Sequence, residues 1–95
     1  MATVNYWFGT WVSADEVGLG PGETHSWAAW GFFNYGDAIS ISAHPVVLAG
    51  VDRQLAVENV SVEGNDSGRR VFYTVRNVGA SSVIAYGVGY SAVGA

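Results

Sequence analysis

Hydrophobic and polar residues alternate along most of this chain with a period of two, which is the period of a β-strand. The alternation is clearest over residues 38–44, which read AISISAH. No window carries both the apolar stripe of an amphipathic helix and the capping residues that would end it. Turn signals rich in glycine, asparagine and aspartate separate the alternating runs at intervals of about 10 to 15 residues. The pattern predicts an all-β fold.

The alternating runs divide the chain into about six strands. They cover residues 4–12, 24–33, 38–44, 55–62, 70–77 and 83–93. Short strands at this spacing are typical of a β-sandwich, so we expect an antiparallel, immunoglobulin-like sandwich that forms one domain over residues 1–95. Pro45 ends the third strand or places it at the edge of a sheet, because proline cannot donate to a central ladder.

The alternation also predicts which side chains face the core. In the last two strands the inward positions hold large residues, namely Val71, Tyr73, Val75, Ile84, Tyr86, Val88 and Tyr90. The opposite positions of the last strand form a flat surface on which an aromatic, a sheet or a partner can lie, namely Ala85, Gly87, Gly89 and Ser91. In the fourth strand we expect a β-bulge near Glu58–Asn59. This bulge would bring four apolar residues to the core side, namely Leu55, Val57, Val60 and Val62.

The first two strands differ from the others in being apolar on both faces. Trp7 and Trp11 alternate with a second apolar row, namely Val4, Tyr6, Phe8 and Val12. In the second strand Trp27 shares a face with His25, whereas Trp30 lies on the opposite face. A second sheet covers only one face of a strand in a sandwich. We therefore expect one of Trp27 and Trp30 to face the core and the other to be covered by a ligand or a neighbouring molecule.

Composition narrows the classes of partner. The apolar fraction is 49%, which is high for a small domain and predicts either self-association into a homo-oligomer or a surface that meets a ligand. The chain has no lysine, and its four arginines face eight carboxylates, for a net charge of −4. A protein that binds nucleic acids or anionic membranes needs a basic face, so neither is an expected partner. No apolar run reaches the roughly 20 residues that insert across a membrane.

Location stays open from the sequence. The chain has no cysteine, which fits a reducing compartment as well as a bacterial exported protein. The first twelve residues, MATVNYWFGTWV, lack the basic region and cleavage site of a signal peptide, and we expect none. An extracellular or cell-surface location follows only if the domain belongs to a larger exported bacterial protein.

Two phrases carry a resemblance to a known group of domains. LGPGE at residues 19–23 is similar to the L-x-PGE turn of bacterial immunoglobulin-like adhesion modules, and residues 55–79 resemble their paired strands ending in N-x-G. The group is that of the CARDB-like β-sandwiches of surface and secreted proteins. In those modules the strand pair precedes the turn, whereas here Pro21 precedes Asn77. The resemblance implies a non-catalytic module that positions, adheres or binds, and it transfers no site residues.

Motifs for catalysis or cofactor binding are weak. The segment GLGPG is followed by neither a lysine nor a helix, so it is expected to be a turn rather than a phosphate-binding loop. Glu23, His25 and His44 are residue types that bind zinc, but nothing in the sequence places His44 beside His25. No G-x-S-x-G nucleophile motif occurs. We expect no enzyme activity, no metal and no cofactor.

The aromatic residues are the strongest functional signal. All four tryptophans lie within the first third of the chain, and flat rings stack on sugar faces as they do on protein partners. Nearby polar side chains can orient a hydroxylated ligand. The candidate ligand-binding residues are therefore Trp7, Trp11, Trp27, Trp30, Asn5, His25, Asn34 and Asp37. The leading hypothesis is a lectin-like carbohydrate-binding module, and the alternative is a self-assembling or adhesion subunit whose aromatics are buried between copies.

Overall fold

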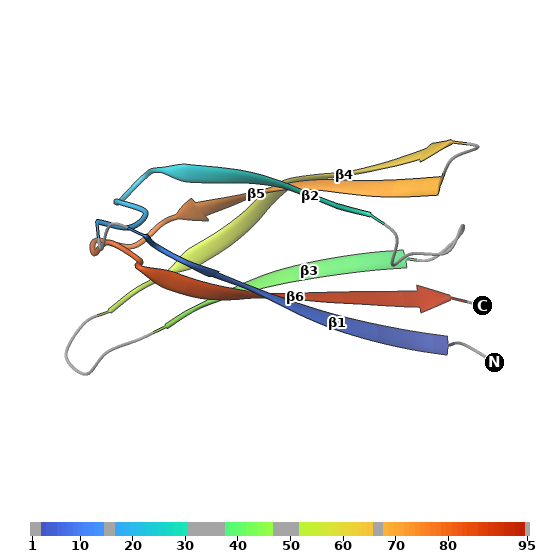
Figure 1. Cartoon of the computed structure of the whole chain (residues 1–95), viewed down its shortest axis with the longest axis horizontal. Helices are drawn as coiled ribbons and strands as arrows, with labels where there is room; N and C mark the ends of the chain where they lie inside the picture. The colour runs from blue at the N-terminus through green and yellow to red at the C-terminus, as the bar shows by residue number, and fades with distance from the viewer. Residues whose placement is uncertain (1–2, 15–16, 31–37, 47–51, 66–67, 95) are drawn as a thin grey trace.

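The computed structural model describes residues 3–14, 17–30, 38–46, 52–65 and 68–94, and describes side chains for 8–14, 17–29, 39–46, 52–64 and 70–91. It confirms the all-β prediction (Figure 1). The strands are β1 (Thr3–Val12), β2 (Thr24–Trp30), β3 (Ala38–Pro45), β4 (Leu55–Asn65), β5 (Gly68–Asn77) and β6 (Ala85–Gly94). The predicted last residues of the second strand, 31–33, lie outside the described residues.

The six strands form two antiparallel three-stranded sheets. One sheet has the order β1-β6-β3 and the other the order β2-β5-β4. The sheets face one another as the two layers of a β-sandwich, close together at the end where β5 leads into β6 and diverging towards the opposite end (Figure 1). β1 and β2 are the edge strands on one side of the sandwich, and β3 and β4 lie in contact on the other. The chain is elongated, with extents of 44 × 25 × 20 Å.

The core lies between the two central strands. Its buried cluster consists of Tyr73, Val75, Val83, Tyr86 and Val88. Val71 is also buried, with 0% exposure, so the inward faces predicted for β5 and, from Tyr86 onward, for β6 are confirmed. The prediction that Ile84 shares this face is corrected, because the chain bends at Ile84 and β6 begins only at Ala85. Val83 takes the buried position instead, with 0% exposure.

The predicted β-bulge in β4 is present between Glu58 and Ser61, where Asn59 has a φ of 55°. Its expected effect is only partly found. Leu55 and Val57 pack against the core, and the register places Val62 opposite the buried Val71. Val60 and Val62 are nevertheless each 46% exposed, because this end of β4 lies where the two sheets diverge (Figure 1).

The flat row of small residues on β6 is covered in part by an aromatic ring, as one of the sequence hypotheses allowed. A Cβ added at Gly87 would lie 2.4 Å from the ring of Phe8, which therefore rests on this glycine from the neighbouring strand. Phe8 remains 60% exposed. The outer face of this sheet is thus apolar and exposed at Phe8, whereas β3 contributes the exposed polar side chains of Ser40, Ser42 and His44.

Residues 18–23 form the turn that begins the second sheet. The amide of Glu23 donates to the carbonyl of Gly20 at 3.0 Å, and Gly22 has a φ of 80°. Proline followed by a glycine of positive φ is the pattern of a type II turn, and the Glu23 carboxylate further accepts from the Gly20 amide at 2.7 Å. The expected assignment of this segment as a turn is therefore confirmed.

We predict that alanine at Gly18 is much more destabilising than alanine at Gly22. Both glycines have positive φ, at 75° and 80°, but a Cβ at Gly18 would lie 2.5 Å from the carbonyl oxygen of Val83, whereas a Cβ at Gly22 meets nothing within 4 Å. Gly22→Ala is expected to cost about 1 kcal/mol for the left-handed conformation alone, and Gly18→Ala about 2 kcal/mol more for the clash. Urea denaturation of both variants measures the difference, and equal losses would contradict it.

Candidate binding site between the sheets

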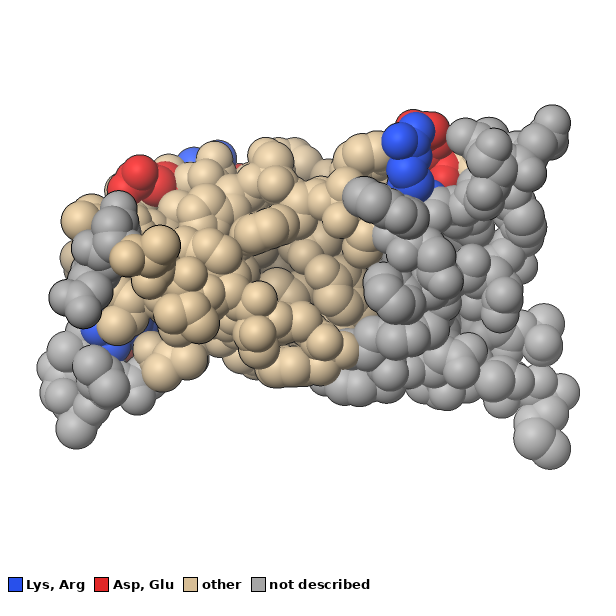
Figure 2. All heavy atoms as spheres, viewed as in Figure 1, with Lys and Arg blue, Asp and Glu red and all other residues tan. Residues whose placement is uncertain are grey.

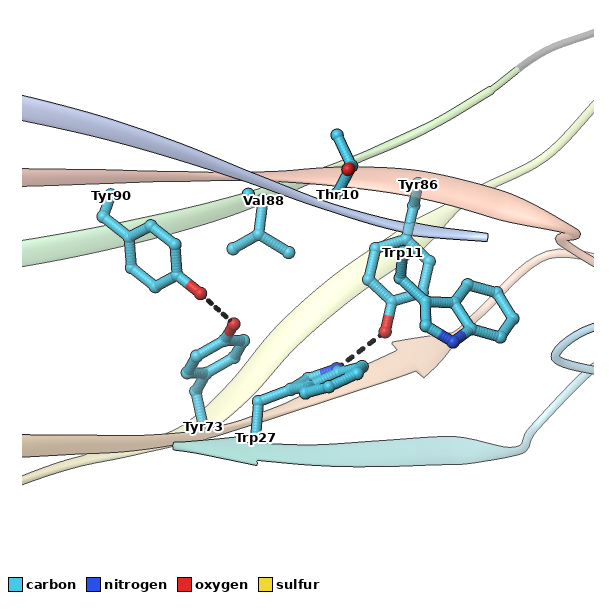
Figure 3. A pocket seen from close by; sticks show the side chains of 8 residues that line it. Thr10, Trp11, Trp27, Tyr73, Tyr86, Val88 and Tyr90 are labelled. Atoms are coloured by element: carbon cyan, nitrogen blue, oxygen red, sulfur yellow. Dashed lines mark hydrogen bonds between the residues drawn. The ribbon is translucent and has the colours of Figure 1, made fainter. Parts of the chain in front are cut away.

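A cavity of about 160 Å³ lies between the two sheets on the side where β1 and β2 are edge strands. Its lining comes from β1, β2, β5 and β6 and consists of Gly9, Thr10, Trp11, Trp27, Tyr73, Tyr86, Val88 and Tyr90. Thr10 points its side chain away from the cavity, so it contributes through its backbone (Figure 3). The remaining side chains make the cavity predominantly aromatic.

Strand register brings these aromatic residues together. Trp11 of β1 pairs with Tyr86 of β6, and Trp27 of β2 pairs with Tyr73 of β5. Directly opposed residues in an antiparallel pair share a face, so each sheet presents an aromatic pair to the interior. The cavity exists because these large rings meet across the gap between the sheets without filling it.

At one end of the cavity the Tyr86 hydroxyl joins the two sheets. The indole Nε1 of Trp27 donates to it at 2.7 Å, and Nδ1 of His25 lies 2.8 Å from the same oxygen. An indole N–H only donates, so the hydroxyl accepts from Trp27 and its own proton is in position for His25. Trp11 packs on both neighbours, with ring centroids 4.6 Å from His25 and 5.0 Å from Tyr86. We call these four residues the Tyr86 cluster.

At the other end the hydroxyls of Tyr73 and Tyr90 hydrogen-bond to each other across the gap. Their rings meet edge to face, with centroids 5.7 Å apart and an angle of 76°. Burial raises the pKa of Tyr73, and the Tyr90 hydroxyl raises it further. Burial also raises the pKa of Tyr86, although the hydrogen bond from Trp27 acts in the opposite direction. Both buried phenols are therefore held in their neutral form.

The arrangement leaves room for one ring. In Figure 3 the indole of Trp27 lies across the space from Val88, with Tyr73 and Tyr90 on one side and Tyr86 and Trp11 on the other. An apolar cavity of about 150 Å³ is large enough to hold benzene. Trp27 is 36% exposed, so its ring is accessible from solvent. The cavity is thus about as large as one that holds a single unsubstituted six-membered ring.

The structure brings together three of the predicted ligand-binding residues, which are Trp11, Trp27 and His25. Trp27 is the tryptophan of β2 that lies on the inner face, opposite Tyr73. The side chains of Asn5, Trp7 and Trp30 lie outside the described residues, although their backbones belong to β1 and β2. Asn34 and Asp37 lie wholly outside the described residues.

Sequence reasoning missed the tyrosines as site residues. Tyr73, Tyr86 and Tyr90 were expected only as core positions, yet all three line the cavity. The signal was available, because a buried tyrosine hydroxyl needs a hydrogen-bond partner and three of them on facing inner surfaces imply a polar network between the sheets. What the sequence does not show is which hydroxyls meet.

The residues considered as zinc ligands do not converge. The Glu23 carboxylate is engaged in its own turn, and His25 belongs to the Tyr86 cluster. His44 lies on the outward-facing row of β3, where its Nε2 is 2.9 Å from the Ser42 hydroxyl. Within the described ranges, no three His, Cys, Asp or Glu side chains form a group able to hold a metal ion. The described part of the chain also contains no helix that could span a membrane.

Neither a protein family, nor a curated protein, nor a solved structure matches this chain. The similarity to CARDB-like modules therefore stays a prediction based on the sequence phrases. In the structure, the two segments that carry this resemblance lie in contact. The amide of Gly22 in the PGE turn donates to the carbonyl of Asn77 in the N-x-G turn at 2.8 Å.

We predict that the free energy of unfolding falls as pH rises above about 10, the pKa of tyrosine in an unfolded chain. Tyr73 and Tyr86 have raised pKa values in the fold. The folded state therefore keeps protons that the unfolded state loses, and stability present below this pH is lost above it. Each such proton contributes a slope of about 1.4 kcal/mol per pH unit.

The variant Tyr86→Phe tests this assignment. It removes one of the two groups, so the decline of stability with pH becomes shallower than in the wild type. At neutral pH the same variant loses about 1–3 kcal/mol, because the Trp27 N–H is left without its acceptor. Urea denaturation at a series of pH values measures both effects, and an unchanged slope would show that Tyr86 is not among the groups with a raised pKa.

Proposed function

We propose that this chain is a non-enzymatic binding module and that the cavity between its sheets holds one sugar ring of a carbohydrate ligand. The observation that carries the proposal is the accessible indole of Trp27, which is 36% exposed and borders a cavity of about 160 Å³. A tryptophan face beside a space of this size is suited to stacking on one ring. The aromatic lining indicates the class of ligand, because aromatic rings stack on sugar rings.

A pyranose ring matches the distribution of polar groups in the cavity. The C–H faces of the ring are apolar, and its rim carries hydroxyls. The cavity correspondingly has Trp27 and Val88 in its middle and polar atoms at its two ends (Figure 3). Those polar atoms are the Tyr86 hydroxyl with His25 at one end and the Tyr73–Tyr90 pair at the other. Aromatic surface supplies contact area, and a few placed polar groups set the orientation.

Among the described residues that line the cavity, the groups that hydrolysis ordinarily needs are missing. Its lining contains no carboxylate, serine or cysteine, and glycoside hydrolysis ordinarily needs a pair of carboxylates beside the bond that is cleaved. His25, a base that lies beside the cavity, contacts Tyr86 and the two indoles of the cluster. These contacts support binding rather than catalysis.

The expected affinity for a single sugar is low. A hexose has about 12 non-hydrogen atoms, and about 0.3 kcal/mol per atom gives roughly 4 kcal/mol, or a Kd on the order of 1 mM. A module of this kind needs several sugars presented together to bind strongly. An array of immobilised glycans provides that multivalency and is therefore the appropriate first test.

We predict that the wild-type chain binds at least one class of glycan on such an array and that Trp27→Leu reduces the affinity about tenfold or more, because one stacking contact contributes on the order of 1–2 kcal/mol. Tryptophan fluorescence titration with the best glycan measures the change in solution. Phe8→Leu is the matched control, because Phe8 is an exposed ring on the outer face and should leave binding unchanged.

A second binding variant guards against loss of folding in Trp27→Leu. Tyr90→Phe keeps the ring and removes one hydroxyl at the cavity's end, so it should weaken binding several-fold while its circular dichroism spectrum matches that of the wild type. The proposal is wrong if the folded wild type binds no glycan, or if both cavity variants bind as the wild type does.

The alternative function, a self-assembling or adhesion subunit, is favoured by a different observation. Phe8 is 60% and Val12 is 71% exposed, and both belong to β1, an edge strand. Exposed apolar side chains on one strand are typical of a surface that another molecule covers. This alternative does not depend on whether the cavity binds a sugar.

A further inference from the structure

The four edge strands of the sandwich differ in how well they are protected from pairing with another strand. An unprotected edge exposes a row of unpaired N–H and C=O groups, and proteins block such edges with bulges, prolines, charges or covering segments. β4 has the bulge at Asn59 and two glutamates, Glu58 and Glu63. β3 lies against β4 and ends in Pro45. Both strands on this side of the sandwich are therefore protected.

Pro45 occupies a position where its ring blocks the edge. The amide of Val46 donates to the carbonyl of Ala85 at 2.9 Å, towards β6. Because N–H directions alternate along an antiparallel strand, the nitrogen of the preceding residue faces away from β6. Pro45 thus removes a donor from the free edge without costing the β3–β6 ladder a hydrogen bond.

β1 has none of these features. It is ten residues long, its register with β6 is continuous from Thr3↔Gly94 to Val12↔Ala85, and its sequence TVNYWFGTWV contains neither a charge nor a proline. The amide of Ser13 donates to Ile84 of the β6 side at 2.8 Å. By the same alternation, the N–H groups of Phe8, Thr10 and Val12 face away from β6. Within the described residues, β1 therefore presents a long row of outward donors that no bulge, charge or proline of its own interrupts.

β2, the other edge on this side, is a poorer pairing surface. It has seven residues, and the strand beside it carries Arg76 opposite Thr24 and Arg70 opposite Trp30. Both arginines form ion pairs with glutamates of β4, Glu63 and Glu58, so the shorter length of β2 is what makes it the poorer surface. Of the four edges, β1 is the one best suited to accept a further strand.

We propose that β1 pairs antiparallel with β1 of a second copy of this chain, so that two three-stranded sheets become one continuous six-stranded sheet. The charge distribution favours a second copy as the partner. The strands of this sheet, β1, β6 and β3, contain no Lys, Arg, Asp or Glu, in a chain whose net charge is −4. Two copies that meet through β1 keep their negatively charged residues away from the contact. A charged partner of another kind would find no opposite charge on this strand.

The side chains of β1 are also complementary to themselves. Phe8 and Val12 lie on one face of the strand, and antiparallel pairing places same-face residues of the two copies opposite one another. Their exposed apolar surface is then shared between copies. In Figure 2 the charged side chains lie at the margins of the visible face, whose centre is uncharged. The radius of gyration of 14.8 Å exceeds the roughly 12 Å expected of a compact chain of this length, so the chain is elongated.

Sedimentation equilibrium of the full chain tests the proposal. The wild type is expected to have twice the 10.0 kDa mass of one chain. Thr10→Pro removes an outward N–H and should give the mass of a monomer with an unchanged circular dichroism spectrum. Thr10→Ala keeps the N–H and should remain a dimer. If Thr10→Pro does not fold, Thr10→Lys serves instead, because a charge on this strand also opposes pairing between copies.

Hydrogen exchange distinguishes pairing along the edge from packing of the outer faces. In the dimer the amides of Thr10 and Val12 should exchange slowly. In monomeric Thr10→Pro, which has no amide at position 10, the amide of Val12 should exchange rapidly. A wild type that is monomeric at every concentration tested would overturn the proposal. So would a dimer in which these two amides exchange rapidly, or one that survives both Thr10→Pro and Thr10→Lys. Sugar binding is tested separately, by the glycan array with the wild-type chain and its Trp27 and Tyr90 variants.

Discussion

A buried asparagine holds the two sheets together at the closed end of the sandwich. Asn77, at the end of β5, is 0% exposed, and its side chain donates to the carbonyls of Leu19 at 2.9 Å and Ser81 at 2.8 Å. Its Oδ1 accepts from the amide of Gly79 at 2.9 Å. Three satisfied hydrogen bonds from one buried amide stabilise the fold more than the same bonds at the surface. Each bond left unmade would leave a desolvated polar group.

This connection determines where the candidate site forms. Asn77 exchanges backbone hydrogen bonds with Gly22 and Glu23, which starts β2 in its register on β5 and places Trp27 opposite Tyr73. Leu19 in turn bridges to Val83, just before β6 begins. The sheets are therefore joined at one end and diverge from it (Figure 1), and the aromatic cavity occupies the widening gap. Its side of the sandwich is also the side on which β1 is an open edge.

Alternation of residue types predicted the local structure well, because successive residues of a strand lie on opposite faces of the sheet. It identified the inner faces of β5 and β6, the bulge at Glu58–Asn59 and the turn at residues 19–23. It failed at Ile84, where a bend interrupts the period of two. It also could not show that the Tyr86 hydroxyl meets Trp27, because that contact joins residues 59 positions apart and depends on how one sheet lies on the other.

The proposed function requires that the cavity beside Trp27 receive a sugar ring, and nuclear magnetic resonance of the indole N–H groups tests this most directly. The four tryptophans give separate signals, which single Trp→Phe variants assign. Added glycan is expected to shift the Trp27 and Trp11 signals together, with one saturating dependence on concentration. If a bound glycan moves only the signals of Trp7 or Trp30, or if none of the four signals moves, the cavity is not the binding site.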